Sequence, residues 1–144
     1  MKLIYQTCKN TPIPDLCLQL LKADPRSPSA DITGLALIIV DVIKARANDA
    51  LVKINQLLKG GGDKKALDNC AANYKIGILE ADIPMAVKAL TLGDPKFAEN
   101  AASDSAVEAI DCEKGFNGKS PLTRVNNGIR DVANVARAII RNLL

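Results

Sequence analysis

Apolar residues recur at every third or fourth position along most of the chain, which is the spacing of one face of an α-helix. Glycines, prolines and capping residues divide this pattern into four long segments. The first segment can begin at Ser29 or Asp31, because either side chain can cap a helix. The predicted long helices cover residues 31–59, 63–92, 94–116 and 120–144. No segment competes as a strand.

The apolar stripes also predict which side chains the helices bury. On the second long helix the inward positions are Leu67, Cys70, Ala71, Tyr74, Ile78, Ala81, Met85 and Leu92. On the third they are Phe97, Ala101, Ser105, Ala109, Cys112 and Phe116. Pro84 lacks a backbone donor and clashes with the preceding turn, so we expect a kink between Glu80 and Pro84. Ser120 is expected to cap the fourth helix, with Pro121 as its first residue.

A shorter pair of helices precedes the four long ones. Residues 3–9 and 14–23 predict a helical hairpin that is too small to fold alone. Residues 24–28 contain two prolines and predict an extended linker that no helix crosses.

Short breaks between the long helices determine the predicted topology. A connection of a few residues reaches only the adjacent antiparallel position. The predicted fold class is therefore all-α, an up-down-up-down four-helix bundle with an N-terminal helical hairpin. We expect one domain over residues 1–144, with the hairpin and linker at 1–28 and the bundle at 29–144.

Composition excludes several classes of function. The chain has no histidine, so Ser-His and Cys-His catalytic groups and histidine metal sites are excluded. The net charge of +3 is spread along the chain, so we expect no nucleic-acid partner. The longest apolar run, residues 35–40, is far shorter than the about 20 residues that span a bilayer, so we expect no membrane partner. We expect no metal and no cofactor either.

The chain contains an even number of cysteines and no C-x-x-C pair, which argues against a zinc ribbon or a redox motif. Disulfides are favoured over four reduced thiols in the core, and they indicate an oxidising compartment. The first residues, MKLIYQTCKN, are too polar for a secretory signal. We therefore expect a mature chain with an added Met1, the alternative being a chain made without a signal.

Helix geometry selects among the three disulfide connectivities that four cysteines allow. Two residues of an antiparallel helix pair lie level when the turn falls midway between them. The midpoint of Cys70 and Cys112 is Thr91, immediately before a predicted turn, and that of Cys8 and Cys17 falls in the break between the two short helices. The predicted disulfides are therefore Cys8–Cys17 and Cys70–Cys112.

Pairs of neighbouring acids are the first candidates for catalysis. Glu80 lies two positions from Asp82, and Asp111 lies two positions from Glu113. Residues at this spacing point to different faces of a helix, so we interpret all four as solvated surface charges. No glycine-rich phosphate loop is present either. We therefore predict no catalytic residues and no enzymatic activity.

Three arginines recur along one flank of the last helix, at Arg130, Arg137 and Arg141. Such a row is most often a solvated face, which is the interpretation we favour. The alternative is a surface that binds an acidic partner.

The stretch GDPKFAEN, residues 93–100, lies where the third helix begins. Asp94 is expected to cap this helix, Pro95 to be its first residue and Phe97 to face the bundle. Lys96 remains unexplained, because a cation in the first turn opposes the helix dipole by about 0.3–1 kcal/mol. An acidic group outside the chain would explain it. A turn stiffened by Pro95 also loses little freedom on docking, so we hypothesise that it binds a partner.

Several segments occur together with these cysteines. They are TCKNTP at 7–12, Cys17, DI at 31–32, LALI at 35–38, Cys70, GDPKFAE at 93–99, CE at 112–113 and AIIRNLL at 138–144. This combination strongly resembles the plant invertase inhibitors, which share a superfamily with the pectin methylesterase inhibitors. The resemblance covers nearly the whole chain, and it implies a four-helix bundle with an N-terminal hairpin and two sequential disulfides.

The resemblance also implies a target. In invertase inhibitors a Pro-Lys-Phe turn enters the active-site cleft, whereas pectin methylesterase inhibitors use other surfaces. It implies that the chain inhibits plant acid invertase, a β-fructofuranosidase, and that Asp94, Pro95, Lys96 and Phe97 bind it. Lys96 would pair with the acidic site, Pro95 would fix the approach, and Phe97 would fill the adjacent space while holding the turn to the bundle.

Other interpretations stay open. The second is a pectin methylesterase inhibitor, and the third is a bundle protein without inhibitory activity, such as a storage or allergen-like relative. The implied location is extracellular, in the apoplast or cell wall, with the vacuole as the alternative.

Overall fold

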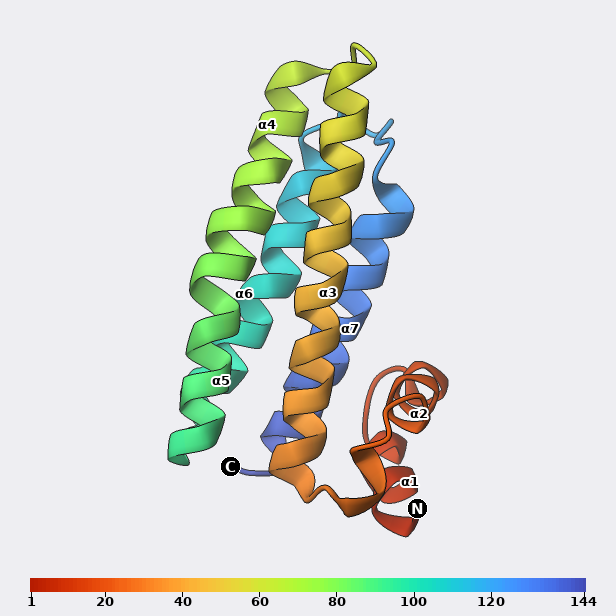
Figure 1. Cartoon of the computed structure of the whole chain (residues 1–144), viewed down its shortest axis with the longest axis vertical. Coiled ribbons are helices and arrows are strands. Elements are labelled where there is room, and N and C mark those ends of the chain that lie inside the picture. The colour runs from red at the N-terminus through yellow and green to blue at the C-terminus, as the bar shows by residue number, and fades with distance from the viewer.

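The longest helix, α3 (Ile32–Lys59), begins at the cap that the sequence predicts. The carboxylate of Asp31 accepts a hydrogen bond of 2.8 Å from the N–H of Gly34. The computed structural model describes residues 1–144, and in it α3 is the first of four long rods that run up, down, up and down (Figure 1). Its buried stripe includes Leu35, Ile39 and Ile43. No strand is present, so the predicted fold class is confirmed.

The second rod is continuous but not uniform. It consists of α4 (Lys64–Ala72), a π-helical segment η2 (Asn73–Asp82) and α5 (Ile83–Leu92). The irregularity expected between Glu80 and Pro84 is therefore the π-helical segment η2, whose wider turns precede Pro84. A π-helical turn holds more residues than an α-turn, so the buried face shifts. The predicted inward positions Ala81, Met85 and Leu92 are exposed. The buried positions are Ile83, Ala86, Ala89 and Leu90.

The third and fourth rods are α6 (Pro95–Lys114) and α7 (Thr123–Arg141). Both α3 and α6 pack on α7 and on the second rod, so α3 and α6 occupy opposite corners of the bundle. The buried positions of α6 are mostly small, which lets its neighbours approach closely. They are Ala98, Glu99, Ala101, Ala102, Ser105, Ala106, Ala109 and Cys112. The predicted start of α7 is wrong by two residues, because Ser120 accepts from the Leu122 N–H in a turn that precedes the helix.

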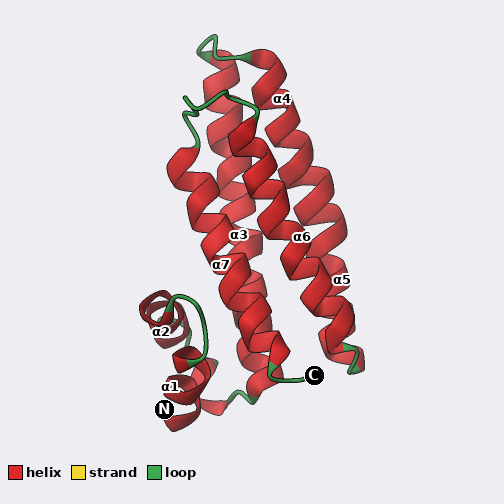
Figure 2. Cartoon of the chain, turned by 180° about the vertical axis from the view of Figure 1, so that it is seen from behind, coloured by secondary structure: helices red, strands yellow, loops and turns green.

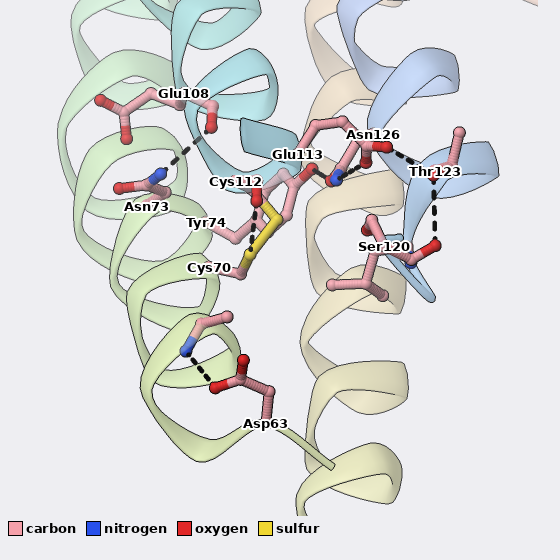
Figure 3. The surroundings of a disulfide bond; sticks show 12 residues. Asp63, Cys70, Asn73, Tyr74, Glu108, Cys112, Glu113, Ser120, Thr123 and Asn126 are labelled. Atoms are coloured by element: carbon pink, nitrogen blue, oxygen red, sulfur yellow. Dashed lines mark hydrogen bonds between the residues drawn. A yellow bond between two sulfur atoms is a disulfide. The ribbon is translucent and has the colours of Figure 1, made fainter. Parts of the chain in front are cut away.

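A disulfide and a polar network join three rods at one end of the bundle (Figure 3). The disulfide links Cys70 of α4 to Cys112 of α6, as predicted. The buried Tyr74 donates its hydroxyl proton to the Asn126 side chain, which donates in turn to Glu113 over 2.8 Å. These contacts fix η2, α6 and α7 to one another.

The N-terminal hairpin consists of α1 (Lys2–Lys9) and α2 (Pro14–Lys22), joined by the predicted disulfide Cys8–Cys17. It packs against α3 and α7, where it buries Ile4 and Leu21 in the core that the bundle also forms. The predicted extended linker is wrong in part, since it leads into a short 3-10 helix, η1 (Ser27–Ser29).

The two termini lie at the same end of the bundle (Figure 2). The turn between α5 and α6 is also at this end, whereas the glycine turn after α3 and the connection from α6 to α7 are at the other. None of the helices combines the length and the apolar character that a membrane span requires.

Candidate functional site

The turn that carries Asp94, Pro95, Lys96 and Phe97 is fixed by its backbone. Gly93 has φ 79°, the left-handed conformation that ends a helix, and the Asp94 N–H donates to the Ala89 carbonyl over 2.8 Å. The Phe97 N–H then donates to the Asp94 carbonyl over 3.1 Å. Asp94 occupies the cap position of α6, but its side chain makes no capping hydrogen bond, so that part of the prediction is wrong.

The aromatic side chain of this turn points outward. Phe97 is 57% exposed, which contradicts the prediction that it faces the bundle. The buried positions of α6 begin one residue later, at Ala98, and a step of one residue turns a side chain by about 100° around the helix. Leu92, at the end of α5, is 64% exposed. Phe97 and Leu92 therefore offer apolar surface on either side of the turn, and Phe97 does not hold the turn to the bundle.

Lys96 has an acidic partner within its own chain. Its Nζ lies 2.8 Å from Oε1 of Glu99, and Nη1 of Arg141 lies 3.0 Å from Oε2 of the same carboxylate. Glu99 is buried, whereas the side chains of Lys96 and Arg141 are 67% and 61% exposed. We refer to Lys96, Glu99 and Arg141 as the Glu99 cluster.

The Glu99 cluster corrects the argument that Lys96 requires an acid outside the chain. The hydrogen bond from Lys96 is the main cause that holds the pKa of Glu99 below its usual range, and the charges of Lys96, Arg141 and Arg137 act in the same direction. Sequence reasoning missed this cluster. Lys96 and Glu99 lie three positions apart on a helix, and this spacing indicates that the two side chains can form an ion pair. Arg141 was not detectable, because it belongs to a different helix.

Two of the four acids predicted to be solvated are instead part of the packing. Asp82 is buried and accepts a hydrogen bond of 3.0 Å from the Ser105 hydroxyl. Burial raises the pKa of Asp82 to about 7, against the effect of that hydrogen bond, and the charges of Asp104 and Glu108 add to the rise. Sequence reasoning missed Asp82 because the π-helical turns bring its position onto the buried face.

Glu113 is the second of these acids, and it belongs to the polar network at the far end of the bundle. Burial opposes its ionisation, but hydrogen bonds from Thr123, Asn126 and Ser120 outweigh that effect and hold its pKa below the usual range. Glu80 and Asp111 are exposed, as predicted.

The arginine row on α7 divides into separate roles. Arg130 pairs with Asp131 at 3.0 Å and with Asn127 at 3.2 Å, so it is satisfied on its own helix. Arg141 belongs to the Glu99 cluster. Arg137 is exposed and, with Arg141, borders a shallow groove of about 350 Å³ between α7 and the hairpin turn at Pro12. The arginine row on α7 is therefore not a uniform solvated face.

Comparisons with known proteins agree with this architecture. The family described as "Plant invertase/pectin methylesterase inhibitor" matches residues 2–142. "Cell wall / vacuolar inhibitor of fructosidase 1" of Arabidopsis thaliana is 49% identical over 138 residues, which cover 95% of this chain and 67% of the relative. "Pectinesterase inhibitor" of Actinidia deliciosa is 32% identical over 149 residues, covering 99% and 79%. A crystal structure of a mutant pectin methylesterase inhibitor from Arabidopsis superimposes with a TM-score of 0.77 at 24% identity, over 93% of this chain and 92% of that one, and so shares the fold.

Proposed function

This chain belongs to the plant invertase/pectin methylesterase inhibitor family, and we propose that it inhibits a plant acid invertase, a β-fructofuranosidase. The observation that carries the proposal is the 49% identity, over 95% of the chain, to a relative named as an inhibitor of fructosidase. We further propose that it acts as a protein ligand and not as an enzyme, with the Asp94–Phe97 turn as its docking element. The two disulfides and the name of that relative support a location in the cell wall or the vacuole.

The geometry of the turn supports this role. Invertases are retaining glycosidases, in which two carboxyl groups flank the scissile bond about 5 Å apart. The Lys96 ammonium can pair with such an acidic site, and Pro95 with Gly93 keeps the turn in one shape before docking. The exposed Phe97 ring contributes apolar contact beside the cation. The substrate is then excluded because the turn occupies its cleft.

Replacement of Lys96 tests this proposal. Loss of one partner of a desolvated charge pair costs about 2–5 kcal/mol, so Lys96→Ala should weaken inhibition of plant acid invertase by about 30-fold or more. Lys75→Ala is a matched control, because Lys75 is also exposed but lies on η2, away from the turn. Inhibition constants are measured from sucrose hydrolysis at several inhibitor concentrations. A Lys96→Ala variant that inhibits as well as the parent removes Lys96 from the mechanism.

A second candidate function is inhibition of pectin methylesterase. The 32% identity to the Actinidia deliciosa inhibitor favours it, although that identity is lower than the one to the fructosidase inhibitor. Titration of the purified protein against both plant enzymes separates the two. Inhibition of pectin methylesterase alone would reject the invertase proposal, and inhibition of neither enzyme would leave a bundle protein without inhibitory activity.

A further inference from the structure

The Glu99 cluster joins the proposed docking turn to the end of the last helix. We infer that Glu99 competes with the target enzyme for the ammonium group of Lys96, and that Arg141 keeps this competition weak enough for Lys96 to be released. The inference rests on the proposed function, because it describes how the docking lysine becomes available. Glu99 and Arg141 are thus positioning residues that set the affinity of the inhibitor without touching the target's carboxylates.

The first step is that the free inhibitor holds Lys96 back. The Lys96 side chain runs along its own helix to the carboxylate three residues later, with Nζ 2.8 Å from Glu99 Oε1. An ammonium held there is not free to enter a cleft in front of the turn. Only the fraction of molecules in which Lys96 is detached binds with full affinity, so the apparent dissociation constant rises as that fraction falls.

The second step is that Lys96 can leave while Arg141 stays. A buried carboxylate without a partner is costly, so Glu99 needs at least one cation. Arg141 reaches it from α7 and binds the other oxygen at 3.0 Å, so the departure of Lys96 leaves one charged partner in place. Without Arg141, Lys96 would be the only direct partner of Glu99, and its release would be opposed more strongly.

Arg137 provides a natural comparison. Its charge helps to hold the pKa of Glu99 low, yet it forms no ion pair with that carboxylate. Arg137 lies one helical turn before Arg141 on α7. A general effect of positive charge would therefore be similar at Arg137 and Arg141. Of these two arginines, only Arg141 contacts Glu99 directly.

The test measures inhibition of plant acid invertase by five variants of the full chain. These are Glu99→Gln, Arg141→Gln, the double variant of these two, Arg137→Gln and Lys96→Ala. Because the Lys96 side chain is 67% exposed, its ion pair with Glu99 restrains it only weakly, and Glu99→Gln should tighten inhibition about 2–5-fold. Arg141→Gln should weaken it by about 3-fold or more. The double variant should inhibit like Glu99→Gln, because Arg141 acts only through Glu99.

Each result has a definite meaning. Equal or weaker inhibition by Glu99→Gln overturns the competition. A loss with Arg141→Gln that persists in the double variant, or that Arg137→Gln reproduces, overturns the role of Arg141. If Lys96→Ala inhibits like the parent, Lys96 does not take part in docking. The proposed docking turn and this inference are then both rejected. If Lys96→Ala loses inhibition while Glu99→Gln changes nothing, only the inference fails.

A measurement on the free inhibitor keeps the test independent of folding and of the enzyme. Thermal unfolding verifies that each variant is folded, and NMR of the lysine side-chain ammonium groups reports on Lys96 directly. The hydrogen-exchange rate of the Lys96 ammonium should be low in the parent, lower still in Arg141→Gln, and high in Glu99→Gln. A Lys96 signal that is the same in all three contradicts the contact on which the inference depends.

Discussion

The buried carboxyl of Asp82 predicts an unusual dependence of stability on pH. The group lies at the junction of η2 and α5, and its only hydrogen bond comes from Ser105 on α6. In the folded chain its pKa is about 7, compared with the ordinary value of 3.8. Between these two values the folded chain keeps a proton on Asp82 that the unfolded chain releases. The free energy of unfolding should therefore fall as the pH rises from about 4 to about 7, and then level off.

The size of this effect follows from the two pKa values. The difference between 3.8 and about 7 corresponds to at most about 4 kcal/mol. Asp82→Asn removes the titration while keeping the shape of the side chain and an oxygen that accepts from Ser105. The variant should therefore match the parent near pH 4 and exceed it in stability by up to about 4 kcal/mol at pH 8.

Urea unfolding without reductant, followed by circular dichroism at several pH values, measures this difference. The low pKa values of Glu99 and Glu113 lower stability at acidic pH, but both groups are present in parent and variant, so subtraction removes them. Asp49→Asn serves as the control, because Asp49 is exposed on α3. Parallel curves for the parent and Asp82→Asn between pH 4 and 8 would refute the reasoning.

Two further predictions concern stability. Replacement of Cys70 and Cys112 by alanine opens a loop with a sequence separation of 42 and should cost about 4 kcal/mol, whereas replacement of Cys8 and Cys17, with a separation of 9, should cost about 2.6 kcal/mol. Chemical unfolding of both variants checks the order, and an equal or reversed loss contradicts the loop-entropy argument. Asp31→Ala removes the cap of α3 and should cost about 1 kcal/mol in the same assay, whereas no loss would show that the cap is redundant.

The parts of the fold that the sequence predicts are those set by local rules. Asp31 caps α3 because a carboxylate at that position can reach the N–H three residues later. The disulfide partners follow from the positions of two turns, since antiparallel helices place residues at equal distances from a turn side by side. Gly93 and Pro95 mark the turn between α5 and α6 for the same kind of reason, since one ends a helix and the other begins the next.

The parts that the sequence does not predict depend on the helix period or on distant contacts. The π-helical turns of η2 change the phase of the second rod, so Met85 becomes exposed and Asp82 becomes buried. The apolar pattern predicts the wrong face for Phe97, because its helix buries small residues beginning at Ala98. The contact of Glu99 with Arg141 joins residues 42 positions apart, and no local pattern indicates it.

Both termini lie at the same end of the bundle as the proposed docking turn, with the C-terminus nearer to it, and this determines how the protein can be handled (Figure 2). A tag, carrier or sensor surface coupled to the C-terminus would crowd the proposed docking turn, and binding of the enzyme would be underestimated. The opposite end of the bundle offers the exposed amine of Lys119 for attachment. Coupling there directs the proposed docking turn into solution.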